Sequence, residues 1–376
     1  MPTYLAPGVY VEEPPPKARP IAGVGTSTAG FIGVVPDTLT FPAPVGVLTV
    51  APEGVAQLIS SWEDFKAKFG DFHANNQILA QAVYGFFNNG GTNCYVLRVT
   101  DMTDLGPSLA TFETIDDIAI VAAPGASTKL QQDALANHCA KLADRVCVLD
   151  GQRNPATLNF DGVKGTTAEN AFAALYFPWI QVFDPASKAA VIVPPSGHVA
   201  GIYARTDATR GVFKAPANEP VLGALDVEKR ITRAQQELLN PKGINIIRDF
   251  SGSIKVYGAR TLGGDDNGDM RYISTRRYMS FLRESIDEGT QFVVFEPNSP
   301  ALWQRIIRSV SDFLYNQWRD GALFGETEKK AFFVKCDEEL NPPSVREAGQ
   351  VITEIGVAIV KPAEFVIFRI EQITGS

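Results

Sequence analysis

Residues 117–151 read DIAIVAAPGASTKLQQDALANHCAKLADRVCVLDG and alternate short apolar runs with a longer amphipathic one. The pattern predicts a strand in DIAIVAAPG, a helix over KLQQDALANHCAKLAD and a second strand in RVCVLDG. Helices that lie between short apolar strands indicate βαβ units and a largely parallel sheet. This stretch therefore predicts an α/β fold.

The same alternation extends in both directions from this stretch. Ser61 and Gly70 are suitable cap residues for a short helix, SWEDFKAKFG. Upstream we predict strands at 29–35 and 93–100 and helices at 61–70 and 76–91. Downstream we predict a helix in TTAENAFAALYF, a strand in PWIQVFDP and a helix at 196–211.

The C-terminal half is expected to be mixed α and β. We predict a helix in DVEKRITRAQQELLN, a strand pair in GINIIRDF and SIKVYGARTL, helices near 271–288 and 299–319, a strand at 329–336 and a hairpin-like segment at 351–360. The 299–319 helix carries an apolar stripe at helical spacing, which marks one buried face. Its members are Leu302, Trp303, Ile306, Ile307, Val310, Phe313, Leu314 and Trp318.

Both termini read as short apolar strands that prolines isolate from the rest of the chain. YLAPGVYV (4–11) precedes three consecutive prolines, and EFVIFRI (364–370) follows Pro362. A strand without a partner in its own chain invites association with another chain. The alternative is that each terminus pairs within its own chain, as termini that lie close together often do.

Composition excludes several classes of protein. The 376 residues carry a net charge of −8, which argues against nucleic acid as a partner, because phosphate binding needs a basic surface. No run approaches the ~18 apolar residues of a membrane span, so no membrane insertion is expected. The N-terminus lacks a signal-peptide pattern, so we expect the chain to be made and first kept in a cytoplasm.

The sequence makes a weak case for catalysis. The loop AAPGASTKL (122–130) has a single glycine and matches neither of the glycine-rich phosphate-binding patterns. LGGDDNGDM (262–270) does not fit the spacing of a calcium loop and reads as a solvated turn. The three histidines are solitary, and the four cysteines read as buried hydrophobes. We therefore predict no catalytic, cofactor-binding or metal-binding residue and no cofactor. The alternative is a nucleotide-binding protein or enzyme that uses a sheet at 117–185.

Eight segments together resemble contractile tail sheath proteins, which occur in phage tails and phage-tail-like injection particles. The segments are LAPGVYVEE (5–13), GVGTSTAGFIG (23–33), PPSGHVAGIYARTDATRGVFKAPANEP (194–220), LNPKGINIIRDFSGSIKVYGARTL (239–262), RYISTRRYMSFLRESI (271–286), FEPNSPALWQRIIRSVSDFLYNQWRDGALFG (295–325), AFFVKCDEELNPP (331–343) and KPAEFVIFRI (361–370). They cover the C-terminal half and the first 35 residues, whereas 36–190 matches only in general character.

The resemblance implies a structural subunit and no enzyme. It implies an inner domain of mixed sheet with flanking helices and an inserted outer α/β domain. On this basis we expect an N-terminal arm at 1–20, a mainly outer domain at 21–220, an inner domain at 221–360 and a C-terminal strand arm at 361–376. Residues 21–35 are a candidate part of the inner domain.

The resemblance also implies an assembly. Hexameric rings stack around an inner tube, and the sheath contracts to drive the tube through a target envelope. Expected partners are further copies of the chain, the inner tube protein, and baseplate and terminal cap proteins. Assembly is expected in a bacterial cytoplasm, after which the chain is part of a virion or a phage-tail-like particle.

Two sets of contact residues follow from the resemblance. The terminal arms are expected to lend strands to neighbouring subunits through Leu5, Val9, Tyr10, Val11, Phe365, Val366, Ile367, Phe368 and Ile370. On the polar side of the 299–319 helix, Arg305, Arg308 and Arg319 are candidate contacts to carboxylates on the tube. The alternative for these arginines is a solvated helix face or ion pairs within the sheath.

Overall fold

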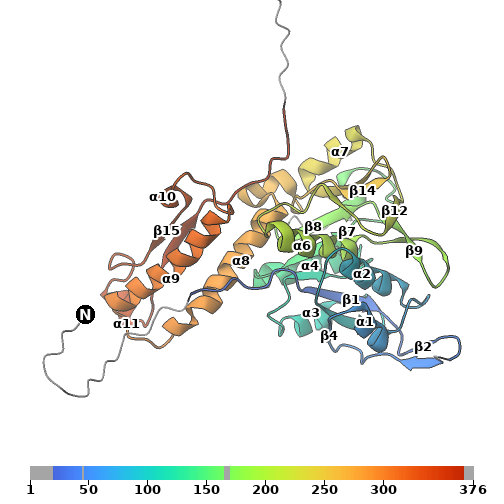
Figure 1. The fold of residues 1–376 in the computed structure, drawn as a ribbon, viewed down its shortest axis with the longest axis horizontal. Helices are drawn as coiled ribbons and strands as arrows, with labels where there is room; N and C mark the ends of the chain where they lie inside the picture. The colour runs from blue at the N-terminus through green and yellow to red at the C-terminus, as the bar shows by residue number, and fades with distance from the viewer. Residues whose placement is uncertain (1–19, 45, 165–169, 368–376) are drawn as a thin grey trace, which may run out of the picture. The chain divides into compact units, whose positions relative to one another are not determined.

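The computed structural model describes residues 20–44, 46–164 and 170–367, which form two compact units (Figure 1). The larger unit contains Gly23–Glu284 and the segment that begins at Ile359. The smaller unit contains Ser285–Ala358 and the residues up to Ala22. The boundary predicted between residues 220 and 221 lies inside the larger unit, because strands from both sides of it share one sheet.

A nine-stranded sheet forms the centre of the larger unit. In spatial order its strands are β11 (Glu219–Pro220), β14 (Ser253–Val256), β13 (Ile244–Phe250), β8 (Ala173–Phe177), β7 (Val146–Asp150), β6 (Ile120–Ala122), β1 (Ala29–Val34), β5 (Cys94–Val99) and β4 (Gln57–Ile59). From β13 to β5 every neighbouring pair is parallel. The strands at the two ends, β11, β14 and β4, pair antiparallel. The predicted, largely parallel α/β sheet is therefore confirmed.

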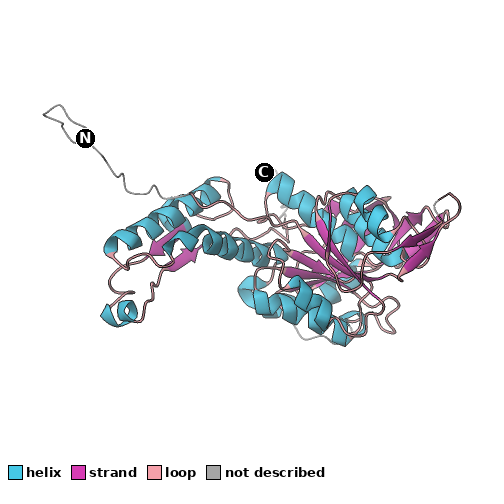
Figure 2. Ribbon diagram, turned by 90° about the horizontal axis from the view of Figure 1, so that it is seen from below, coloured by secondary structure: helices cyan, strands magenta, loops and turns pink. Residues whose placement is uncertain are grey.

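Helices cover both faces of this sheet (Figure 2). One face packs against α1 (Trp62–Phe69), α2 (Gln77–Asn88) and α6 (Ser196–Arg210), and the other against α3 (Gly106–Phe112) and α4 (Lys129–Leu142). Successive side chains of β6 point to opposite faces of the sheet. Ile120 and Ala122 belong to the hydrophobic core on the α2 and α6 side, and Val121 belongs to the core on the α3 and α4 side. Burial on two faces explains why the central strands are almost continuously apolar.

Smaller elements surround the central sheet. They are the antiparallel sheet of β10 (Ala189–Val193), β9 (Ile180–Asp184) and β12 (Ala224–Val227), the hairpin of β2 (Thr38–Thr40) and β3 (Val47–Thr49), the helices α5 (Phe160–Lys164) and α7 (Arg233–Leu239), and the 3-10 segments η1 (Asn240–Lys242) and η2 (Gly264–Met270). The antiparallel sheet places the predicted strand PWIQVFDP outside the parallel sheet.

Two of the predicted helices are wrong in part. The segment AALYF, within the helix predicted at TTAENAFAALYF, is the central strand β8, and all five of its side chains are buried. An alanine-rich segment favours helix by itself, but pairing with β7 and β13 overrides that local preference. In DVEKRITRAQQELLN, only Arg233–Leu239 is α-helical, because Thr232 caps the helix with Gln235 and the preceding residues end β12.

The smaller unit is built around one long amphipathic helix. After α8 (Ile273–Thr290), which begins in the larger unit, its elements are η3 (Gln291–Val293), α9 (Pro300–Arg319), α10 (Glu328–Ala331), β15 (Phe332–Lys335), α11 (Pro343–Glu347) and β16 (Glu354–Val357). The predicted stripe on α9 is largely buried and packs toward β15. The hairpin-like prediction at 351–360 is wrong, since this segment gives one strand, β16, that pairs antiparallel with β15.

Candidate assembly interface

The predicted arm residues fall in two groups. Leu5, Val9, Tyr10, Val11, Phe368 and Ile370 lie outside the described residues. Phe365, Val366 and Ile367 are described and form neither helix nor strand, and they are 70%, 69% and 80% exposed. Three consecutive exposed apolar side chains suit contact with another chain. Their pairing with a neighbouring subunit stays a prediction.

The smaller unit contains a sheet of only two strands. Among the described residues, neither β15 nor β16 pairs with a third strand. Phe332 is buried, whereas the ring of Phe333 is half-exposed and covers Gly356 on the opposite strand. Two-stranded sheets are marginal by themselves, and an open edge can accept a further strand. This sheet is therefore the candidate acceptor for an arm.

The three candidate tube-contact arginines differ in their surroundings. Arg305 is half-buried, its Nη1 lies 3.1 Å from Glu296 Oε2, and its guanidinium lies 5.3 Å from the Phe292 ring centroid. Arg308 and Arg319 are exposed and form no ion pair with any residue in the described part of the chain. Eleven residues is close to three helical turns, so these two share one face of α9, about 16 Å apart. The structure therefore favours Arg308 and Arg319 over Arg305 as free cations.

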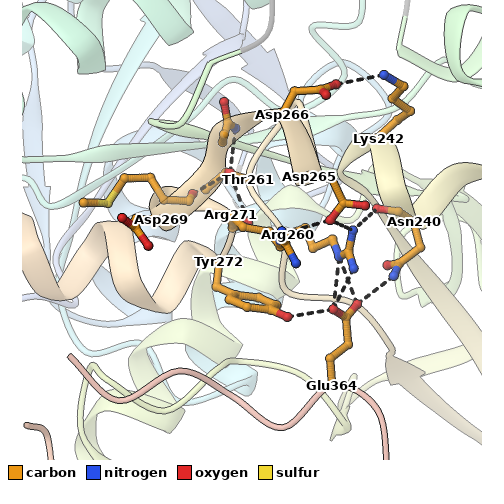
Figure 3. A network of polar contacts seen from close by, with 12 residues as sticks. Asn240, Lys242, Arg260, Thr261, Asp265, Asp266, Asp269, Arg271, Tyr272 and Glu364 are labelled. Atoms are coloured by element: carbon orange, nitrogen blue, oxygen red, sulfur yellow. Dashed lines mark hydrogen bonds and ion pairs between the residues drawn. The ribbon is translucent and has the colours of Figure 1, made fainter. Parts of the chain in front are cut away.

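Just before the exposed apolar residues, Glu364 is held by a polar network that the sequence did not predict (Figure 3). Its carboxylate accepts hydrogen bonds from Arg260 Nε at 2.9 Å and Arg260 Nη2 at 2.8 Å. It also accepts from Asn240 Nδ2 at 2.6 Å and from the Tyr272 hydroxyl at 2.9 Å. Donors from three positions of the larger unit, 240, 260 and 272, thus converge on one carboxylate.

The electrostatics of this network favour the ionised acid. Burial alone would raise the pKa of Glu364, but hydrogen bonds from Arg260, Asn240 and Tyr272 outweigh burial and lower that pKa. A charge-assisted, bidentate arginine contact is among the strongest hydrogen-bonded pairs. One signal in the sequence could have pointed to this site: Glu364 is a single acid within the otherwise apolar stretch AEFVIF.

The carboxyl ends of the parallel strands carry a second buried acid. Asp150, at the end of β7, accepts hydrogen bonds from the Gly125 amide at 2.9 Å and the Ser196 amide at 2.8 Å. The Ser196 hydroxyl donates to the same carboxylate at 2.8 Å. Burial raises the pKa of Asp150 to about 6, although these hydrogen bonds act to lower it. Nucleotide phosphates often bind to backbone amides at such strand ends and helix N-termini. Here the Asp150 carboxylate already accepts the hydrogen bonds of the Gly125 and Ser196 amides, so these two amides are not available to a phosphate.

The aspartates of η2, which could in principle bind a cation, are engaged in ion pairs with basic side chains. In η2, Asp265 pairs with Arg260 and Arg271, Asp266 with Lys242, and Asp269 with Lys361. Residues 20–44, 46–164 and 170–367 contain no cluster of three or more potential metal-binding side chains. Across the same ranges, no helix is long and apolar enough to cross a membrane.

Comparison with known proteins decides the family. Residues 99–262 match the central domain of the phage tail sheath protein family, and residues 265–373 match its C-terminal domain. The chain belongs to the phage tail sheath family. The resemblance found in the sequence is therefore confirmed, over more of the chain than the quoted segments cover.

Individual sheath proteins show how far the similarity extends. The chain is 30% identical to a sheath chain of PVC, an extracellular contractile injection system in its contracted state, with a TM-score of 0.80 and 99% of each chain covered. It is also 30% identical to a chain of the anti-feeding prophage baseplate, with a TM-score of 0.77, 99% of this chain covered and 100% of the other. A prophage major tail sheath protein of Pseudomonas aeruginosa (strain UCBPP-PA14) is 27% identical over 67% of this chain. The chain spans 64% of that relative's length.

Proposed function

We propose that this chain is the structural subunit of a contractile sheath. Copies polymerise as stacked hexameric rings around an inner tube, and contraction of the sheath drives the tube through a target envelope. The observation that carries the proposal is the similarity, over 99% of both chains, to a sheath subunit in a contracted injection system. The role is structural, without catalysis or a bound cofactor.

In this proposal the two terminal arms join subunits. Each arm adds a strand to the inner-domain sheet of a neighbouring copy, where main-chain hydrogen bonds give cohesion and alternating side chains give register. The open edges of the β15–β16 sheet and the exposed residues Phe365, Val366 and Ile367 support this. The inner domain then includes the smaller unit, and the outer domain lies within the larger one.

The tube is the second proposed partner. Arg308 and Arg319 offer two unpaired cations on one face of α9, which suits carboxylates on a tube surface. Single exposed ion pairs contribute only about 0–1 kcal/mol, so such contacts can release during contraction. Charge reversal at both positions should weaken binding to purified tube, whereas reversal of the paired Arg305 should have a smaller effect. Unchanged tube affinity in the double variant would contradict this assignment.

The baseplate and a terminal cap are the remaining proposed partners, and the baseplate chain of the anti-feeding prophage supports the first. We propose that assembly takes place in a bacterial cytoplasm and that the chain then forms part of a virion or a phage-tail-like particle. Neither nucleic-acid binding nor membrane insertion belongs to this role.

Electron microscopy of the purified chain tests the proposal. Tubes or stacked six-fold rings are expected, and a persistent monomer that gains thermal stability with a nucleotide would favour the enzyme alternative instead. Deletion of residues 1–13 or 362–376 should leave a folded chain that no longer polymerises. If both truncated chains assemble normally, the arms do not join subunits.

A further inference from the structure

We infer that Glu364 is a positioning residue that fixes the point at which the C-terminal arm leaves its own subunit. It does so by accepting hydrogen bonds from Arg260, Asn240 and Tyr272, three donors of the larger unit (Figure 3). The inference rests on the proposed function, because it concerns the arm that is proposed to join subunits.

The Arg260 side chain is held in place independently of Glu364. The backbone N–H of Arg260 donates to Asn245 Oδ1 at 2.7 Å, and Asn245 Nδ2 donates back to the Arg260 carbonyl at 2.8 Å. The guanidinium also contacts Asp265 Oδ1 at 2.9 Å and the Asn240 carbonyl at 3.3 Å. The Arg260 side chain is 3% exposed. Its orientation is therefore set by the larger unit, and the arm supplies only the missing carboxylate.

Polar contacts, and not apolar burial, hold the segment that carries Glu364. Of the residues from Lys361 to Ile367, all but Pro362 and Glu364 are exposed, and the Glu364 side chain is only 19% exposed. The neighbouring pair between Lys361 and Asp269 has an N–O distance of 2.7 Å but lies in solvent. Exposed pairs of that kind are weak, so Glu364 is the main attachment of the segment.

The attachment shortens the tether between the subunit and its arm. With Glu364 bound, residues 365–367 separate the anchor from Phe368, which lies near the middle of the predicted arm contacts at 365–370. Without it, the tether begins after Ala358, the last residue of the smaller unit in this stretch, and comprises residues 359–367. The effective concentration of a tethered group falls roughly as the −3/2 power of tether length, so a threefold longer tether lowers it about fivefold.

The experiment compares four full-length chains: wild type, Glu364→Ala, Lys361→Ala and the deletion of residues 362–376. Critical concentrations for polymerisation are measured by sedimentation and electron microscopy. Glu364→Ala should raise the critical concentration about fivefold, following the tether estimate. Lys361→Ala should leave it at the wild-type value, and the deletion should abolish assembly.

A second measurement separates positioning from a general loss of stability. In the unassembled chain, chymotrypsin should cleave after Phe365 faster in Glu364→Ala than in wild type, while the thermal unfolding temperature stays the same. Tyr272→Phe removes one of the hydrogen bonds to Glu364 and should give an intermediate cleavage rate.

The outcomes distinguish the inference from the proposed function. If Glu364→Ala assembles at the wild-type concentration while the deletion abolishes assembly, the anchor is wrong and the arm proposal stands. If the deletion also assembles normally, the arm does not join subunits and both ideas fail. An equal effect of Glu364→Ala and Lys361→Ala on cleavage would likewise overturn the anchor.

Discussion

Removal of the Asp207 carboxylate should destabilise the larger unit strongly, because it leaves a buried arginine without its counter-ion. Asp207 lies on α6 and Arg277 on α8, and their side chains are 7% and 4% exposed. Arg277 Nη1 donates to Asp207 Oδ1 at 2.9 Å, and Nη2 donates to Oδ2 and to the Thr26 carbonyl. Burial would lower the pKa of Arg277, but Asp207 outweighs it and raises that pKa. In the Asp207→Ala variant burial acts on this pKa without the opposing carboxylate, but a guanidinium is so strongly basic that the arginine stays charged.

The expected loss follows from the geometry of the pair. Two unit charges about 4 Å apart attract by about 4 kcal/mol at an effective dielectric constant of about 20. Removal of one partner from a buried pair costs about 3–5 kcal/mol, because the remaining charge has lost its partner but stays desolvated. We expect Asp207→Ala to lower the free energy of unfolding by this amount. Adding Arg277→Met should recover part of it, since no unpaired charge then remains.

Urea denaturation of the full chain, followed by tryptophan fluorescence, measures these differences, and hydrogen exchange in α6 places them in the larger unit. Glu237→Gln is a matched control, because it breaks the exposed Arg233–Glu237 pair and should cost only about 0.3–0.5 kcal/mol. A loss below about 1 kcal/mol for Asp207→Ala would refute the reasoning. A double variant no more stable than Asp207→Ala would also refute it.

Two further predictions concern the core of the larger unit. A Cβ at Gly201 would lie 2.4 Å from the Phe86 carbonyl on α2, so Gly201→Ala should force α2 and α6 apart and cost about 1–3 kcal/mol in urea denaturation. The control Gly25→Ala meets nothing within 4 Å, and an equal loss there would contradict this reason. Burial raises the pKa of Asp150 to about 6, which is above the pKa of this carboxyl in the unfolded chain. The Asp150 side chain therefore contributes fully to stability below pH ~4, and this contribution is lost as the pH rises through 6. Unfolding free energies of wild type and Asp150→Asn should therefore diverge between pH 5 and 7.5, with wild type gaining relative stability toward low pH; parallel curves would argue against a raised pKa.

Local patterns account for the parts of the fold that were predicted. Apolar runs separated by amphipathic segments gave the order of β6, α4 and β7, and Ser61 does cap α1 by accepting from the Asp64 amide. The apolar stripe on α9 could be predicted from the sequence because helical spacing places its members on one face of the helix. Each of these signals depends on residues within a few turns of one another.

The candidate interface was predicted less completely. The apolar residues after Glu364 were recognised, and three of them are exposed as arm contacts require. Arg305 was grouped with Arg308 and Arg319, but Glu296 lies nine residues earlier in the chain, and no helical pattern connects the two. Spacing on one helix identifies a shared face, whereas it does not show which neighbouring loop supplies a counter-ion.

The sequence by itself determined the α/β class, the amphipathic helices and the family, because these depend on local periodicity and on segments in a fixed order. Only the tertiary structure decided that AALYF is a central strand, since its pairing with β7 and β13 outweighs helix propensity. It also brought Glu364 to Arg260, 104 residues earlier, and Arg277 to Asp207, 70 residues earlier. Charged residues so far apart in the chain come into contact only because the packing of the sheet and helices brings them together. Local sequence patterns therefore cannot predict these ion pairs.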